Sequence, residues 1–209
     1  MAPHPILTAP EATTSANQAP ASHLMSRLAA RKRRSAAASR DTGTKTQPLS
    51  TEEFDRLVAG LDYPVFVVTT AHETARAGCL VGFATQVSIG PPRFLVCLSV
   101  NNRTYDVARH ASLIAVHVLA PSQHDLAELF GSTTGDEVDK FSQCRWQPGP
   151  NDIPLLQDCQ RRIVGRILEQ HQFGDHVGFV LEPLKADVAS NGPGLSFEQV
   201  QDIDPGHSA

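Results

Sequence analysis

The chain has 209 residues, of which 41% are hydrophobic and 19% are charged, a composition typical of a globular protein. The first 50 residues carry seven Lys or Arg and two acidic residues, a net charge of +5, whereas the remainder carries 11 basic and 20 acidic residues, a net charge of −9. An acidic body argues against nucleic acid as a partner, because phosphate binding needs a basic surface.

The sequence also predicts a cytoplasmic protein without a membrane partner. No apolar stretch approaches the roughly 20 residues that a membrane-spanning helix needs, and no signal-peptide pattern is present. The four cysteines show no paired close spacing, which favours reduced thiols over a disulfide framework.

Composition divides the chain into three parts. Residues 1–48 are rich in Ala, Ser, Thr and Pro, and they bury too little apolar area to offset the entropy of ordering, which predicts a disordered basic tail. Residues 49–190 have the composition and length of one folded domain. Residues 191–209 form a polar C-terminal extension, in which 205–209 are expected to fray.

The first expected element is a short amphipathic helix, because Ser50 and Glu53 have the spacing of a capping box and apolar residues follow at helical intervals. Two further helices are expected over 104–111 and 122–130, the latter opening with a capping spacing from Ser122 to Asp125. Several short strands with few helices predict a closed or partly closed antiparallel barrel. The expected strands are 65–70, 78–89, 94–100, 113–119, 163–168 and 177–181.

The stretch from residue 78 to residue 104 is the most informative for function. Small residues over 78–84 indicate that something approaches the backbone closely, either a ligand ring or a neighbouring strand. Pro91 and Pro92 then interrupt the strand, because proline lacks an N–H donor. The loop 101–104 offers the Arg103 guanidinium and a helix start to an anion, with an ordinary polar turn capped by Thr104 as the alternative. An apolar slot with such a rim suits flavin mononucleotide.

One histidine is a candidate catalytic residue. His176 follows Gly174 and Asp175 just before an expected strand, where Asp175 can orient its ring; a structural or solvated histidine is the alternative. No histidine or cysteine spacing indicates a metal site, and neither glycine-rich phosphate loops nor a nucleophile elbow occur.

Taken together, these segments resemble the flavin reductase-like family, whose members have the FMN-binding split-barrel fold. Residues 63–70 are similar to the family's first barrel strand, and 88–92 to its Ser-x-x-Pro-Pro corner. Residues 115–119 and 174–176 follow in the expected order. The resemblance covers about 54–188 and implies a mainly β, antiparallel Greek-key split barrel with a few short helices.

The resemblance implies an NAD(P)H-dependent flavin oxidoreductase. Such a protein transfers hydride from NADH or NADPH to FMN or FAD, and the reduced flavin can pass to a partner monooxygenase. Members are generally homodimers with the flavin near the subunit interface. His176 would place the nicotinamide, residues 80–85 and Ser88 would face the flavin, and the loop 101–104 would hold its phosphate. The implied cofactor-binding residues are Leu80, Val81, Gly82, Phe83, Ala84, Thr85, Ser88, Asn101, Asn102, Arg103 and Thr104.

One segment departs from the family pattern. Many members have a Thr-, Ser- and Asn-rich stretch where this chain has Leu80–Ala84, so those hydroxyl and amide contacts to the flavin are missing or replaced by backbone. Two alternatives therefore stay open: a flavin- or haem-binding carrier or sensor without reductase turnover, and a deazaflavin-dependent oxidoreductase on the same barrel.

Overall fold

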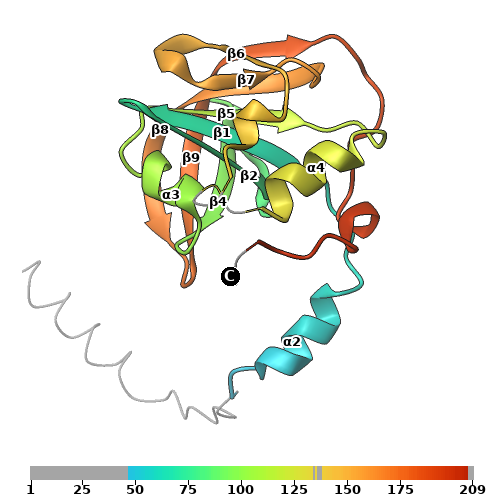
Figure 1. Cartoon of the computed structure of the whole chain (residues 1–209). Coiled ribbons are helices and arrows are strands. Elements are labelled where there is room, and N and C mark those ends of the chain that lie inside the picture. Colours follow the sequence, from blue (N-terminus) through green and yellow to red (C-terminus); the bar gives the residue numbers. More distant parts are fainter. Residues whose placement is uncertain (1–46, 134, 136–137, 207–209) are drawn as a thin grey trace, which may run out of the picture. The chain divides into compact units, whose positions relative to one another are not determined.

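Seven antiparallel strands form the main sheet, which we describe from a computed structural model covering residues 47–133, 135 and 138–206 (Figure 1). The strand order is β2-β1-β5-β8-β9-β4-β3, and the sheet curls until β2 contacts β4 from its other end. Strands β6 and β7 form a separate pair. The expected antiparallel barrel is therefore confirmed. The strands are β1 (Phe66–His72), β2 (Ala75–Val81), β3 (Ala84–Ser88), β4 (Arg93–Ser99), β5 (Leu113–Val118), β6 (Trp146–Pro148), β7 (Pro154–Leu156), β8 (Arg161–Gln172) and β9 (His176–Val188).

Helices and 3₁₀ turns connect and cover the strands. Helices α3 and α4 both pack on β2 and flank it in Figure 1. Within the described part of the chain, no helix has the length and apolar character that crossing a bilayer requires. The helical elements are α2 (Thr51–Val58), α3 (Arg103–Ala108), α4 (His124–Gly131) and the 3₁₀ turns η1 (Lys140–Ser142), η2 (Pro150–Asp152) and η3 (Glu198–Val200).

The helix caps confirm one expectation and contradict two. The Ser50 hydroxyl donates to Glu53 Oε2 over 2.7 Å and the Glu53 N–H donates to Ser50 Oγ over 3.3 Å, which is the expected capping box. Asn102, not Thr104, caps α3, because its side chain accepts the Thr104 N–H over 2.8 Å. The expected Ser122 cap is wrong: α4 begins at His124 without a side-chain cap.

Three hydrophobic clusters hold the described part of the chain together, and the two larger ones carry most of the core. The largest one fills the barrel interior with alternate residues of its strands, such as Val96 and Leu98 of β4 and Phe179 of β9. The second lies outside, where Phe130 of α4 and Leu195 of the C-terminal segment pack over β1. Each such side chain contributes roughly 1.5–3 kcal/mol by leaving water, so both clusters fix the strands that carry the site.

The expected strand 78–89 is in fact two strands, β2 and β3, which separate at Gly82 and Phe83. The small residues here accommodate aromatic rings of the protein itself. A Cβ at Gly78 would lie 2.8 Å from Cε1 of Phe130, and one at Gly82 would lie 2.8 Å from Cε2 of Tyr63. The turn from Ile89 to Pro92 then joins β3 to β4, as the proline pair predicts.

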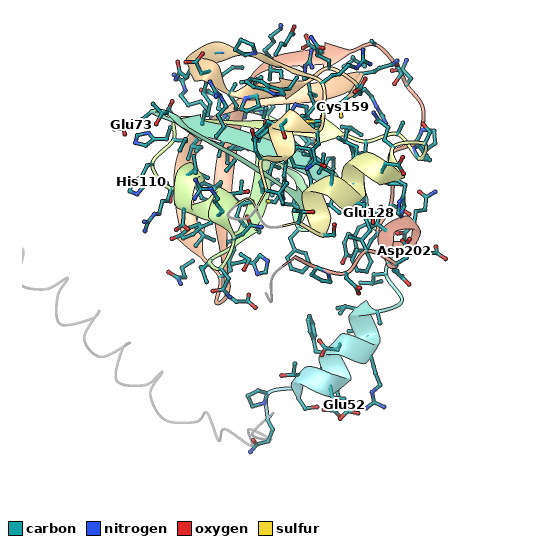
Figure 2. All side chains as sticks on the ribbon, viewed as in Figure 1. Glu52, Glu73, His110, Glu128, Cys159 and Asp202 are labelled. Atoms are coloured by element: carbon teal, nitrogen blue, oxygen red, sulfur yellow. The ribbon has the colours of Figure 1, made fainter. Side chains whose placement is uncertain are left out.

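The C-terminal segment returns to the barrel, although fraying was expected for its end. The Leu195 N–H donates to the Leu119 carbonyl over 2.9 Å, and the Gly206 N–H donates to the Gly131 carbonyl over 3.1 Å. Asp202 accepts from His124 of α4 over 3.0 Å and lies beside that helix in Figure 2. The fraying prediction is therefore wrong at residues 205 and 206, and residues 207–209 lie outside the described residues, as do residues 1–46 of the predicted tail.

Candidate active site

A cavity of about 350 Å³, the apolar cavity, opens where β2 and β4 approach each other. Strand β2 and the break after it supply one wall, β4 supplies a second, and the C-terminal segment supplies a third. Its lining is mostly aliphatic and aromatic, which is the environment that a planar organic ring prefers. The lining residues from these walls include Cys79–Phe83, Cys97–Ser99, Phe197, Val200, Ile203 and Pro205.

Four rings from distant segments follow one another along this cavity. Phe197 stacks on Tyr63, with ring centroids 4.9 Å apart and planes 22° apart. The Tyr63 ring lies 6.4 Å from that of Phe83, and the Phe83 ring meets His176 edge-on at 5.2 Å. Because Phe83 is 56% exposed, it offers an open ring face next to the histidine.

The turn before β9 fixes His176. Gly174 has φ +92°, a conformation that glycine adopts without strain, and the Val100 N–H donates to the Asp175 carbonyl over 2.9 Å. His176 Nδ1 lies 2.8 Å from Asp175 Oδ1, and this hydrogen bond lowers the pKa of the Asp175 carboxyl. With Nδ1 bound to Asp175, the Nε2 edge of the His176 ring is left for a ligand.

A second cavity of about 270 Å³, the cation cavity, adjoins the first. It is lined by three cationic side chains, Arg76 of β2, Arg103 of α3 and Lys140 of η1, with Asp139 as a carboxylate beside them. Lys140 is only 5% exposed, and its Nζ donates to the carbonyls of Gly78 and Phe130 over 3.3 and 3.1 Å. Desolvation lowers the Lys140 pKa from its usual value. The surplus of positive charge suits an anion such as a phosphate.

The two cavities are neighbours along two elements of the fold. Gly78 lines the cation cavity and Cys79 lines the apolar one; likewise Arg103 lines the cation cavity and Asn102 the apolar one. Adjacent residues of the same two segments therefore supply the apolar lining and the cationic lining. Across residues 47–133, 135 and 138–206, no group of three His, Cys, Asp or Glu side chains is placed to hold a metal ion.

Comparison with known proteins shows the family to which the chain belongs. Residues 58–201 match the Flavin reductase like domain. The chain belongs to this family. It is 32% identical over 133 residues to the FMN reductase (NADH) RutF of Agrobacterium fabrum, covering 64% of this chain and 76% of that protein. It is 26% identical to the 4-hydroxyphenylacetate 3-monooxygenase reductase component of Escherichia coli, covering 69% and 85%.

A solved structure confirms the split-barrel fold of the flavin reductase family. The FMN-binding protein from Thermus thermophilus superposes with a TM-score of 0.60 at 27% sequence identity, covering 68% of this chain and 76% of that one. The resemblance that the sequence alone indicated, and the fold that it implied, are both confirmed.

The structure brings most of the expected site residues of this flavin reductase-like chain together. Eight of the twelve expected residues line one of the two cavities. The other four line neither cavity: Ala84, Thr85 and Ser88 lie on β3, and Asn101 precedes α3. The roles of all twelve residues stay predictions. Leu80, Val81, Gly82, Phe83, Asn102 and His176 line the apolar cavity, and Arg103 and Thr104 line the cation cavity.

The segment that departs from the family pattern divides into core and surface. Val81 belongs to the barrel core, and Leu80 packs against the outer hydrophobic cluster. Gly82 and Phe83 are more open, so a ring in the apolar cavity would meet mainly backbone and the Phe83 ring here. The prediction that backbone replaces the missing hydroxyl and amide contacts stays a prediction, and Phe83 lies in the open part of this segment rather than in the core.

Several residues that line the cavities were missed by the sequence reasoning. Tyr63 stood in a recognised motif but had no role assigned, and a single Lys140 carries no local signal. The apolar residues Phe197, Val200 and Ile203 recur every three positions in a polar segment, and this spacing is a signal that was available.

Proposed function

We infer that this chain is an oxidoreductase that transfers hydride from NADH or NADPH to a bound flavin. One observation carries the inference: an apolar, ring-lined cavity adjoins a cation cavity in a member of the flavin reductase family. The relative from Agrobacterium fabrum is named an FMN reductase (NADH), which supports the same reaction here. The flavin, FMN or FAD, supplies the hydride-accepting ring.

The protein's own residues bind and orient the reactants in this proposal. The flavin ring lies in the apolar cavity beside Phe83, and its phosphate meets Arg103 and Lys140 in the cation cavity. His176, held by Asp175, positions the nicotinamide against the exposed side of the flavin ring. Holding two rings in contact away from water is the main requirement of hydride transfer, so no acid–base pair is needed.

The function further implies a homodimer. Strand β3 is an end strand of the sheet, and Val87 and Ile89 on and beside it are 49% and 88% exposed. An exposed apolar edge strand favours association. If a second copy paired with this edge, β3 of one copy, with Thr85 and Ser88, would lie near the flavin bound by the other copy. Light scattering should give twice the chain mass, and Ile89→Lys should yield monomers.

The proposed setting is the cytoplasm, with a flavin-dependent monooxygenase as the acceptor of reduced flavin. The Escherichia coli relative is the reductase component of such a monooxygenase, which supports this partner. All four cysteines have free thiols, which fits a reducing compartment. Burial raises the pKa of each thiol, which keeps it protonated and unreactive.

The test is NADH oxidation by the purified protein with and without added flavin, followed at 340 nm. Flavin-dependent oxidation supports the reductase. A coloured protein that does not oxidise NADH or NADPH would instead favour a carrier or sensor. A bound cofactor with a deazaflavin spectrum would redirect the proposal to that cofactor.

A further inference from the structure

A third cavity continues the line of the two that the proposed function uses. It has a volume of about 300 Å³, and we call it the Trp146 cavity. It shares Arg76, Asp139 and Phe141 with the cation cavity, so the two adjoin. Its lining residues are Thr74, Arg76, Asp139, Phe141, Ser142 and Trp146.

Strand β2 sets the spacing of the three cavities. The apolar cavity meets the strand around Val81, the cation cavity around Ala77, and the Trp146 cavity just before it at Thr74. A strand advances about 3.3 Å per residue, so Val81 and Ala77 lie roughly 13 Å apart along the chain, and Ala77 and Thr74 roughly 10 Å. Ring, phosphate and base follow one another in the same order in an extended flavin dinucleotide.

The chemistry of the Trp146 cavity suits a nucleobase. Trp146 Nε1 donates to the Phe141 carbonyl over 3.0 Å, and the Phe141 ring meets it at 5.7 Å, so the indole is held in one orientation. Indole faces stack on any base. Asp139 accepts the Phe141 N–H through Oδ1, and its second carboxylate oxygen can accept from an exocyclic amino group.

Arg76 now covers the indole. Its guanidinium carbon lies 5.1 Å from the Trp146 ring centroid, and its side chain is exposed. An exposed arginine loses little when it leaves an aromatic face, and it gains more from a charge-assisted bond to a phosphate in the cation cavity. The same motion uncovers the indole for a base.

We propose that this chain prefers FAD to FMN, with the pyrophosphate in the cation cavity and the adenine stacked on Trp146. The inference rests on the proposed function, since it places the flavin ring in the apolar cavity. FMN would fill the first two cavities and make no contact with the third. NADH also carries an adenine, so the experiment must separate the two sources.

The experiment measures the dissociation constants of riboflavin, FMN and FAD, and the Michaelis constant for NADH, on the full chain. We expect FAD to bind about 10-fold more tightly than FMN, the worth of one stacked base. Trp146→Leu should remove that difference and leave FMN affinity unchanged, whereas Trp146→Phe, which keeps an aromatic face, should retain most of it.

Each outcome decides the proposal. Equal binding of FMN and FAD to the wild-type protein overturns it, and this comparison stands even if Trp146→Leu does not fold. A Trp146→Leu variant with an unchanged FAD preference but a raised Michaelis constant for NADH also overturns it and assigns the cavity to the nicotinamide dinucleotide. Failure of riboflavin, FMN and FAD alike to bind would instead contradict the proposed function itself.

Discussion

The apolar cavity and the cation cavity lie side by side but are built by different physics. The apolar cavity depends on shape, because the rings of Tyr63, Phe83 and Phe197 come from distant segments and pack into one wall. The cation cavity depends on charge, because Arg76, Arg103 and Lys140 all line it and, among the described residues, only one carboxylate, that of Asp139, lies beside them. Ring binding should therefore depend on volume and hardly on salt, whereas phosphate binding should depend on charge and weaken with ionic strength.

The largest expected effect concerns the barrel that carries both cavities. His117 is fully buried, with Nδ1 3.1 Å from the Val67 carbonyl, and its Nε2 accepts the Leu156 N–H over 3.1 Å. Burial, the main cause, lowers its pKa to about 4. In the unfolded chain the His117 ring binds a proton near pH 6.5, whereas in the folded chain it does so only near pH 4. The stabilisation that comes from the neutral ring is therefore fully present above pH 6.5, and about 3 kcal/mol of the unfolding free energy is lost by pH 4.

Urea unfolding at pH 7, 5.5 and 4.5 measures this loss. The variant His117→Asn keeps a donor and an acceptor but does not titrate, so its unfolding free energy should fall less across the same range. An equal fall in both proteins would show that His117 does not control the acid sensitivity.

The next effect tests the shape of the apolar cavity. Gly82→Val places methyl groups where the Tyr63 ring now lies, and overpacking of this kind lowers the unfolding free energy by about 1–3 kcal/mol. Because Gly82 and Tyr63 both line the apolar cavity, riboflavin and FMN should also lose affinity, by the same factor, in fluorescence titrations. Gly60→Val is the control, because a Cβ at Gly60 meets nothing within 4 Å. A loss confined to FMN would contradict the assignment of the ring to this cavity.

The complementary change tests charge. Arg103→Ala should weaken FMN binding by about 1–3 kcal/mol, the worth of a hydrogen bond to a charged group, and leave riboflavin unaffected. The salt dependence of FMN binding should shrink as well. Arg109→Ala is the matched control, since Arg109 lies at the other end of α3 near Asp106 and lines neither cavity. Unchanged FMN affinity would remove Arg103 from the phosphate site.

The smallest effect separates nicotinamide binding from flavin binding. His176→Ala should raise the Michaelis constant for NADH by about 2- to 10-fold, which corresponds to one net hydrogen bond, while FMN affinity stays the same. His110→Ala serves as the control, because His110 is exposed and packs against His72. Reduced FMN affinity in the His176 variant would mean that this ring contacts the flavin instead.

The sequence predicted much of the barrel because its signals are local. Alternating apolar residues marked β1, β4, β5 and the centre of β9, and the proline pair marked the turn into β4. The pair β6 and β7 was not predicted, since its strands are three residues long and contain prolines. The single strand expected over 78–89 divides at Gly82 and Phe83, where a distant ring, Tyr63, packs against Gly82.

For the site, the sequence by itself determined the family, the turn at Gly174–His176 and the loop that carries Arg103. These features depend on residues that are neighbours in the chain, because turns form from local residue types and motifs are recognised by their order. Only the tertiary structure decided that Phe197 completes the aromatic wall and that Lys140 joins the cation cavity. These residues meet the site through long-range packing, which depends on how the barrel closes and where the C-terminal segment docks. No local pattern encodes that closure, so the partners across each cavity became visible only in the folded chain.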